Sequence, residues 1–86
     1  MFSVLLMPEV KKYYERSGPA VARKLARCFN QLESEPFHHP NIKRLKGNLS
    51  GSLRYRIGDL RVIYRVLVET KTVEVQTVAH RSEVYE

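Results

Sequence analysis

The strongest constraint on the fold of this chain is an alternation of apolar and polar residues in its second half. The alternation runs from Leu53 to Ile57, stops at Gly58-Asp59, and resumes from Leu60 to Val68. A period of two is the pattern of a β-strand with one buried face. A two-residue connection that begins with glycine is typical of a tight β-hairpin. The sequence therefore predicts two antiparallel strands with a short turn between them.

The rest of the chain supplies the other elements of an α+β fold. Residues 2–7 predict a strand, and Pro8 opens a first helix, since proline suits the first helical position. Ser17-Gly18-Pro19 ends that helix and begins a second, which is expected to extend to Ser34. A last strand is predicted from Thr72 to Ala79. The expected order is β-α-α-β-β-β in one domain, residues 1–86: an N-terminal strand and a helical hairpin packed on a mostly antiparallel sheet.

Histidine and cysteine usage gives no sign of a metal centre or cofactor. The only cysteine, Cys28, lies on the apolar side of the second helix, where a buried structural thiol is expected. His38 and His39 are adjacent, so they do not share a face of a regular element, and we expect them to be exposed in a loop. The sequence thus predicts no metal and no cofactor. It also has no apolar run long enough to span a membrane. A single cysteine cannot form an internal disulfide, which favours a cytoplasmic location.

The two-residue turn fixes which side chains face each other in the sheet. Arg56 is expected opposite Arg61, on the face away from the core. If Thr70-Lys71 forms a second two-residue turn, Arg61 in turn lies opposite His80. Like charges placed opposite each other destabilise a sheet, so a row of this kind favours a functional explanation over a solvated surface.

The charge of the chain indicates an anionic partner. The net charge is +6, and residues 38–65 contain seven basic residues against the single acid Asp59. A basic balance this strong favours nucleic acid, an acidic protein or a membrane surface as the partner. Four of these basic residues lie outside the row described above and are predicted to bind the nucleic acid: Lys43, Arg44, Lys46 and Arg65.

A row of arginines with a histidine limits the chemistry that the site can perform. Without a carboxylate pair or a metal-ligand cluster, the row fits RNA cleavage in which the ribose 2′-oxygen attacks the adjacent phosphate. Such a reaction needs a group that removes a proton, cations that stabilise the anionic phosphorane, and a group that protonates the leaving oxygen. Arginines provide the cations, because they bind phosphate oxygens through two parallel hydrogen bonds.

Three stretches of the sequence resemble the RelE/ParE-type toxin superfamily. They are Leu45-Lys46-Gly47, the pattern R-x-R-x-G-D-x-R-V-I-Y that begins at Arg54, and the closing H-R-x-x-V-Y that begins at His80. The resemblance covers essentially the whole chain, including the first strand and the helical hairpin. It is more specific for the superfamily than for the target that the toxin attacks.

In the RelE branch, the resemblance implies cleavage of messenger RNA in the ribosomal A site. The family's basic pair corresponds to Arg54 and Arg56, its arginine on the next strand to Arg61, its late arginine to Arg81, and its C-terminal tyrosine to Tyr85. In this branch the resemblance implies a metal-independent endoribonuclease, an mRNA interferase that inhibits translation.

Arginine stands here where some relatives carry lysine, and arginine does not deprotonate in practice. His80 is therefore the preferred candidate for the general base. Tyr85 has two open interpretations, a catalytic or base-stacking residue and a hydrophobic anchor for the C-terminal tail.

Two other functions remain possible on the same fold. One is poisoning of DNA gyrase without ribonuclease activity, as in the ParE branch, which generally lacks the basic constellation. The other is nucleic-acid binding without turnover. Either toxin implies a small acidic antitoxin as a partner, with a heterotetramer as one expected assembly, and the nuclease also implies mRNA and the ribosome.

Overall fold

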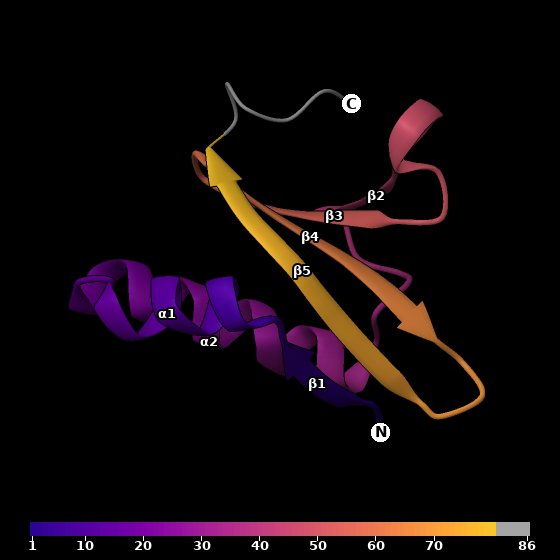
Figure 1. Ribbon diagram of the computed structural model, residues 1–86, viewed down its shortest axis with the longest axis horizontal. Coiled ribbons are helices and arrows are strands. Elements are labelled where there is room, and N and C mark those ends of the chain that lie inside the picture. Colours follow the sequence, from indigo (N-terminus) through magenta and orange to yellow (C-terminus); the bar gives the residue numbers. More distant parts are fainter. Residues whose placement is uncertain (81–86) are drawn as a thin grey trace.

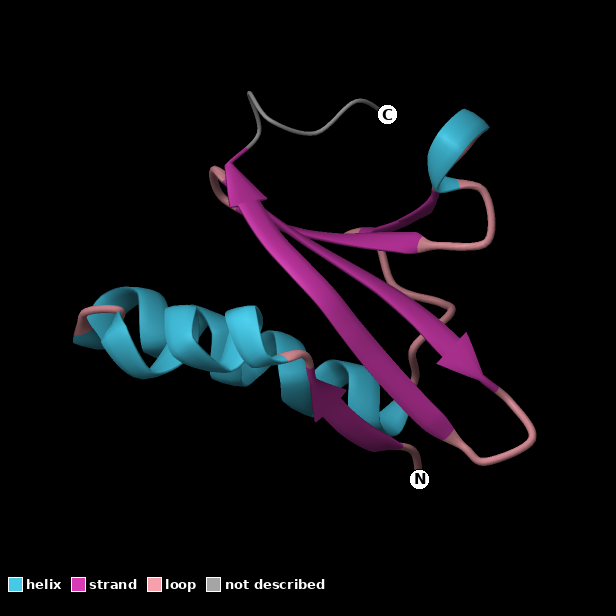
Figure 2. Ribbon diagram, viewed as in Figure 1, coloured by secondary structure: helices cyan, strands magenta, loops and turns pink. Residues whose placement is uncertain are grey.

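Two helices cover one face of a five-stranded sheet in the computed structural model, which describes residues 1–80 (Figure 1). The helices form a hairpin along one side of the sheet, and all connections between elements are short (Figure 2). The elements are β1 (Ser3–Leu6), α1 (Pro8–Arg16), α2 (Pro19–Ser34), β2 (Ile42–Arg44), the short 3₁₀ helix η1 (Gly47–Leu49), β3 (Leu53–Ile57), β4 (Leu60–Leu67) and β5 (Thr72–His80). The strand order is β1-β5-β4-β3-β2, with β1 parallel to β5 and the other pairs antiparallel.

The sequence signals at the helix ends confirm the predicted hairpin. Pro8 and Pro19 stand at the first turns of α1 and α2, where the missing N–H of proline costs no hydrogen bond. Ser17 and Gly18 have extended backbones and separate the two helices. No helix of the described residues has both the length and the apolarity that a membrane crossing requires.

The core lies between the helices and the inner face of the sheet. The α2 stripe that faces it is buried and consists of Leu25, Cys28, Phe29 and Leu32. From the sheet, Tyr55 and Tyr64 point inward as predicted, and Tyr64 is 0% exposed. Burial raises the pKa of the Tyr64 hydroxyl, and that hydroxyl donates a 2.7 Å hydrogen bond to the carbonyl oxygen of Pro36. A buried tyrosine needs such a partner, so this bond ties β4 to the loop after α2.

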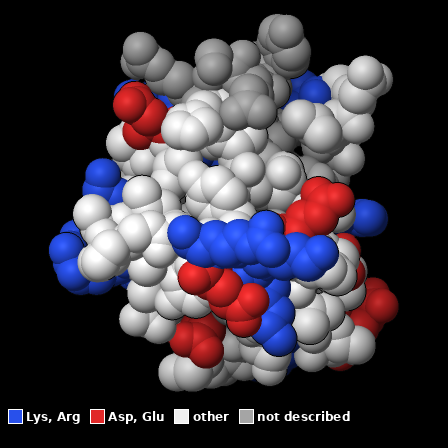
Figure 3. All heavy atoms as spheres, turned by 60° about the vertical axis from the view of Figure 1, so that its left-hand side comes forward, with Lys and Arg blue, Asp and Glu red and all other residues white. Residues whose placement is uncertain are grey.

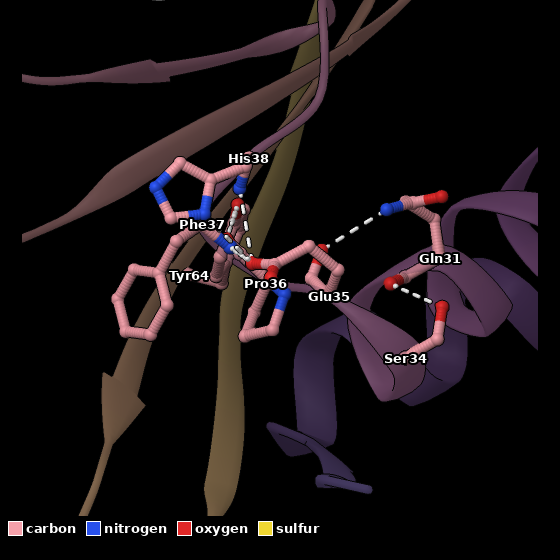
Figure 4. Close-up of polar contacts among 7 residues, drawn as sticks. All are labelled: Gln31, Ser34, Glu35, Pro36, Phe37, His38 and Tyr64. Atoms are coloured by element: carbon pink, nitrogen blue, oxygen red, sulfur yellow. Dashed lines mark hydrogen bonds and ion pairs between the residues drawn. The ribbon is translucent and has the colours of Figure 1, made fainter.

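The end of α2 is closed by side-chain and backbone hydrogen bonds (Figure 4). The Glu35 carboxylate accepts hydrogen bonds from the backbone N–H of Phe37 at 2.7 Å and of His38 at 3.1 Å. These bonds, above all the one from Phe37, lower the pKa of Glu35. Gln31 donates from Nε2 to the carbonyl oxygen of Glu35 at 3.0 Å. The loop therefore leaves the helix in one defined direction.

The register of the first hairpin is as predicted. Ile57 pairs with Leu60 and Arg56 pairs with Arg61. Gly58, at the first turn position, has φ of +55°, which glycine adopts without the steric cost that a side chain would impose.

The predicted register of the second hairpin is wrong. Leu67 pairs with Thr72, so the turn contains four residues rather than the two residues Thr70-Lys71. A bulge then places an extra residue in β5 near Gln76, between the pairs of Tyr64 with Val75 and of Ile63 with Thr77. A bulge reverses the alternation of side chains along its strand. It is why the core face of β5 continues at Val78, which packs against the core, rather than at Ala79.

The sheet also has a strand that the sequence did not predict. Ile42–Arg44 forms β2, an edge strand that pairs with β3. Three residues are too few for a recognisable alternation, and this strand exists because β3 offers it a free edge. The predicted α+β fold with a mostly antiparallel sheet is otherwise confirmed.

Candidate functional site

The outer face of the sheet, away from the helices, carries the arginines predicted from the sequence. Arg54 and Arg56 project from β3 on this face, and Arg61 projects from β4, because alternate residues of a strand share a face. Lys43 pairs with Arg54 and therefore lies on the same face of β2. The register thus brings four cationic side chains to one region at the β2–β3–β4 end of the sheet.

A polar cleft of about 440 Å³ lies beside two of these arginines. It is lined by Pro40, Asn41, Arg54, Arg56 and Gly58. Its floor is fixed by the carbonyl oxygen of Asn41, which accepts the backbone N–H of Arg56 at 2.9 Å and Nη1 of Arg54 at 3.1 Å. The loop before β2 is in this way fastened to β3, and the two arginines are held at the cleft.

Arg54 and Arg56 have different environments in this cleft. Arg54 is 7% exposed, so its guanidinium is largely enclosed by protein. Arg56 is exposed and faces solvent at the mouth of the cleft. An enclosed cation interacts strongly with a bound anion because water screens it less, whereas an exposed one is free to follow the ligand. The pair is suited to bind an anion such as a phosphate in the cleft.

Arg61 is also buried, at 8% exposed, which the sequence did not predict for a residue on the outer face. Its Nη1 donates to the carbonyl oxygens of Gly58 and Leu60, both at 3.2 Å. The carbonyl dipoles of the turn therefore stabilise the Arg61 cation. This arrangement reduces the expected repulsion between Arg56 and Arg61, because the Arg61 guanidinium folds onto the turn while the Arg56 side chain extends outward.

The residues predicted to bind RNA do not form one cluster. Lys43 and Arg65 are exposed on the same face as the arginine cleft, although Arg65 lies farther along β4, opposite Glu74. Arg44 faces the other side of β2, with its guanidinium 5.9 Å from the centre of the Phe37 ring. Lys46 is exposed immediately before η1. Lys43 is the member of this set that pairs directly with a cleft arginine.

His80 does not join the arginine row in the register that was predicted. Ala79 pairs with Arg61, and His80 pairs with Leu60. Since Leu60 belongs to the core face, strand alternation places His80 on the opposite side of the sheet from Arg56. The longer turn and the bulge in β5 cause this difference. Arg81 and Tyr85 lie outside the described residues.

The loop histidines differ from the predicted exposed pair. His38 is exposed beside Glu35, with 3.4 Å between Nδ1 and Oε2. His39 is half-buried, stacks on Tyr55 with 5.2 Å between ring centres, and accepts the backbone N–H of Asn41 through Nδ1 at 3.1 Å. His39 thereby helps to position Asn41 at the cleft. No sequence signal marked Asn41, because its role depends on a carbonyl group that every residue has.

Two further groups near the site are kept in their neutral forms by burial. Burial raises the pKa of the Cys28 thiol to about 12, which confirms the predicted buried structural cysteine. Burial also raises the pKa of the Tyr55 hydroxyl. Neither group is suited to act as an anionic nucleophile near neutral pH.

Solved structures of toxins are similar to this fold. A chain of the RelBE2 toxin–antitoxin complex from Mycobacterium tuberculosis has 27% sequence identity and a TM-score of 0.78, with 93% of this chain and 98% of that chain covered. A chain of the RelE–RelB complex from Pyrococcus horikoshii has 26% identity and a TM-score of 0.81, with 96% and 98% covered. A chain of the heterotetrameric YoeB–YefM complex from Staphylococcus aureus, at 16% identity and a TM-score of 0.72 over 93% and 97% of the chains, shares the fold.

Sequence comparison points to the same group of proteins. The sequence has no significant match among curated proteins. It does match the family model described as the ParE toxin of the type II toxin–antitoxin system parDE, over residues 8–85. Because this match spans nearly the whole chain, the protein belongs to the RelE/ParE superfamily of toxins from type II toxin–antitoxin systems.

Proposed function

We propose that this toxin is an endoribonuclease that cleaves messenger RNA in the ribosomal A site. The observation that carries the proposal is the polar cleft with Arg54 at its side and Arg56 at its mouth. A cleft of this kind binds the phosphate of a nucleic acid, and its cations are placed to stabilise the extra negative charge of a phosphorane. Arg61 supports the cleft by fixing the turn that contains Gly58.

In the proposed reaction, the 2′-oxygen of the ribose attacks the adjacent phosphorus atom. The bond from phosphorus to the 5′-oxygen breaks, which leaves a 2′,3′-cyclic phosphate upstream and a 5′-hydroxyl downstream. A base removes the proton of the 2′-hydroxyl, and an acid protonates the departing 5′-oxygen. We assign the proton transfers to Tyr85 ahead of His80, since the latter pairs with a residue of the core face. Arg81 is the additional cation in this proposal.

The alternative is a gyrase poison without ribonuclease activity, and the ParE description of the matching family model favours it. The two functions differ in their target and in their product. For either function we propose an acidic antitoxin as the partner, because the toxin carries a net charge of +6 and its structural relatives crystallised with antitoxins. Assembly into a heterotetramer and action in the cytoplasm, where translation occurs, complete the proposal.

The decisive experiment compares two programmed ribosome complexes that differ at one atom. In one, the A-site codon is all RNA; in the other, the sugar at the cut site is 2′-deoxy and lacks the nucleophile. We expect the toxin to cut only the first and to leave a 2′,3′-cyclic phosphate, also in the presence of EDTA when ribosome integrity is maintained by other means. We expect slow cutting of the same RNA without ribosomes, because the ribosome positions the substrate.

Three results would contradict the proposal. Cutting at the 2′-deoxy site would mean that water or a protein group attacks the phosphorus atom. Efficient, sequence-specific cutting of free RNA would remove the role of the ribosome. Gyrase trapped on broken DNA, with no RNA cut on ribosomes, would establish the alternative.

A further inference from the structure

A second, smaller cleft lies on the other side of β3 from the arginine cleft. It has a volume of about 140 Å³ and is lined by Lys24, Arg27, Cys28, Asn41, Tyr55 and Ile57. The two basic residues come from α2, where a spacing of three residues puts them on one side of the helix. Both are exposed, and neither has an ion pair within the part of the chain that the structure describes. Two cations thus line a small hollow, and neither is paired with an acidic side chain among residues 1–80.

The two clefts meet at the edge of the sheet. Asn41 lines both of them. β2 begins at Ile42, and just before it the Asn41 carbonyl oxygen accepts a hydrogen bond from the Arg56 N–H. Past that bond, no strand of the described residues lies beside this edge of β3. Gly58 lines the arginine cleft, and a Cβ atom at this position would lie 3.9 Å from Nζ of Lys24. The Lys24 ammonium group therefore reaches the turn that borders the arginine cleft.

The charge of the helical hairpin fits an extended anionic ligand on this side. Residues 8–34 contain six basic residues and three acidic ones. Lys and Arg side chains cross the middle of the molecule on the side where the hairpin lies, with Asp and Glu beside them (Figure 3). The two clefts lie on opposite faces of β3 and share Asn41 at its edge, so a ligand that occupies both must bend around that edge. The backbone of a single strand suits this path, because it bends more easily than a duplex.

We propose that Lys24 and Arg27 form a second phosphate subsite, which holds the backbone of single-stranded RNA next to the phosphate in the arginine cleft. This inference rests on the proposed function and extends it, because it assigns the RNA a path around the edge of β3. The subsite binds a neighbouring phosphate and takes no part in bond breaking. It increases the affinity for RNA and positions the RNA strand relative to the arginine cleft.

The test is RNA binding as a function of salt concentration. The probe is a short 2′-O-methyl oligouridylate, which lacks the nucleophile and is not consumed; its affinity is measured by fluorescence anisotropy over a range of KCl concentrations. The variant is Lys24→Gln/Arg27→Gln, since glutamine keeps the length and helix propensity of these exposed residues. The control, Arg16→Gln/Lys71→Gln, removes the same charge at the far end of the hairpin and at the β4–β5 turn.

Each phosphate contact to single-stranded nucleic acid contributes about 0.7 to the slope of log K against log salt. Loss of two contacts lowers the slope by about 1.4, which is roughly a 25-fold loss of affinity at 0.1 M salt if the two proteins bind equally at 1 M. We expect this loss for the Lys24/Arg27 variant and a much smaller one for the control. Equal losses in both variants would overturn the inference, because net charge alone would then explain them.

A third variant separates this inference from the proposed function. Arg56→Gln removes a cation from the arginine cleft and is expected to lower the slope by about 0.7. If Arg56→Gln lowers the slope and Lys24→Gln/Arg27→Gln does not, the second subsite is wrong while RNA binding by the cleft stands. If the wild-type protein and all three variants bind RNA equally weakly, the second subsite is wrong, whereas the proposed function is decided separately by cleavage of messenger RNA on programmed ribosomes.

Discussion

Arg56 and Arg61 lie directly opposite each other on β3 and β4, but only Arg56 extends into solvent. Arg61 is 8% exposed and donates two hydrogen bonds to carbonyl oxygens of the β3–β4 turn. The two guanidinium groups therefore have different environments: Arg56 is exposed to solvent, and Arg61 is bonded to the backbone at the turn. Substitutions at the two positions are expected to have different consequences.

Arg56→Gln should reduce RNA cleavage on ribosomes without destabilising the fold. Loss of a cation at the phosphorane costs about 2–4 kcal/mol of barrier, which is roughly 30- to 1,000-fold in rate. The free energy of unfolding should change by no more than about 0.5 kcal/mol, because the residue is exposed. Arg16→Gln, at an exposed arginine in the last turn of α1, is the charge-matched control for single-turnover cleavage. Equal rate losses in both variants would contradict the assignment.

Arg61→Ala should lower the free energy of unfolding by about 1–3 kcal/mol, measured by urea denaturation. The reason is that two carbonyl oxygens, the part-buried one of Gly58 and the buried one of Leu60, lose a charged donor. Arg65→Ala is the control, since Arg65 is an exposed arginine of the same strand, and its effect should stay within about 0.5 kcal/mol. A variant at Arg61 as stable as the wild type would show that these hydrogen bonds do not fix the turn.

Tyr64→Phe should lower the free energy of unfolding by about 1–3 kcal/mol. The substitution removes a buried hydroxyl and leaves the Pro36 carbonyl oxygen without its 2.7 Å hydrogen bond. The ring itself remains, so no cavity forms. Tyr13→Phe makes the same chemical change on a side chain that is 36% exposed and should be nearly neutral. Chemical denaturation of the two variants side by side measures the difference, and equal stability would argue against this bond as a tie between β4 and the loop.

Glu35→Gln should destabilise the protein at neutral pH and lose this effect in acid. The hydrogen bond from Phe37 N–H, together with that from His38, lowers the pKa of the native carboxyl below its ordinary value of 4.5. A lowered native pKa gives stability that is present above the unfolded pKa and is lost as the pH falls through the native one. The difference in unfolding free energy between wild type and variant should therefore shrink below about pH 4.5. A difference that is independent of pH would exclude the charge of Glu35 as its source.

Cys28 should react slowly with iodoacetamide in the native protein. Its pKa is raised from 9.0 to about 12, so the thiolate fraction near pH 8 falls by roughly 10³-fold. Burial slows the reaction further. Labelling followed by mass spectrometry, with the urea-unfolded protein as control, measures the ratio. Rapid native labelling would mean that the second cleft opens to Cys28.

The features that the sequence determined are those that depend on residues close together in the chain. Proline and glycine set the ends of the helical hairpin, and the apolar stripe of α2 set its buried side. The first strand pair was correct in every position because a two-residue turn with glycine at a positive φ leaves one register. The positions of Arg54, Arg56 and Arg61 on one face followed directly from that register.

Tertiary structure decided the features that depend on groups distant in the chain. A four-residue turn and a bulge in β5 made Ala79 rather than His80 the partner of Arg61. The sequence could not distinguish the two turns, because a turn of two residues and a turn of four residues leave the same side chains of β5 facing the core. The edge strand β2 formed because β3 had an open edge. The Asn41 carbonyl became part of the cleft only when the loop closed onto Arg54 and Arg56. Lys24 came to stand beside Gly58 because α2 packs across β3, and no local pattern encodes a contact that arises from the packing of two separate elements.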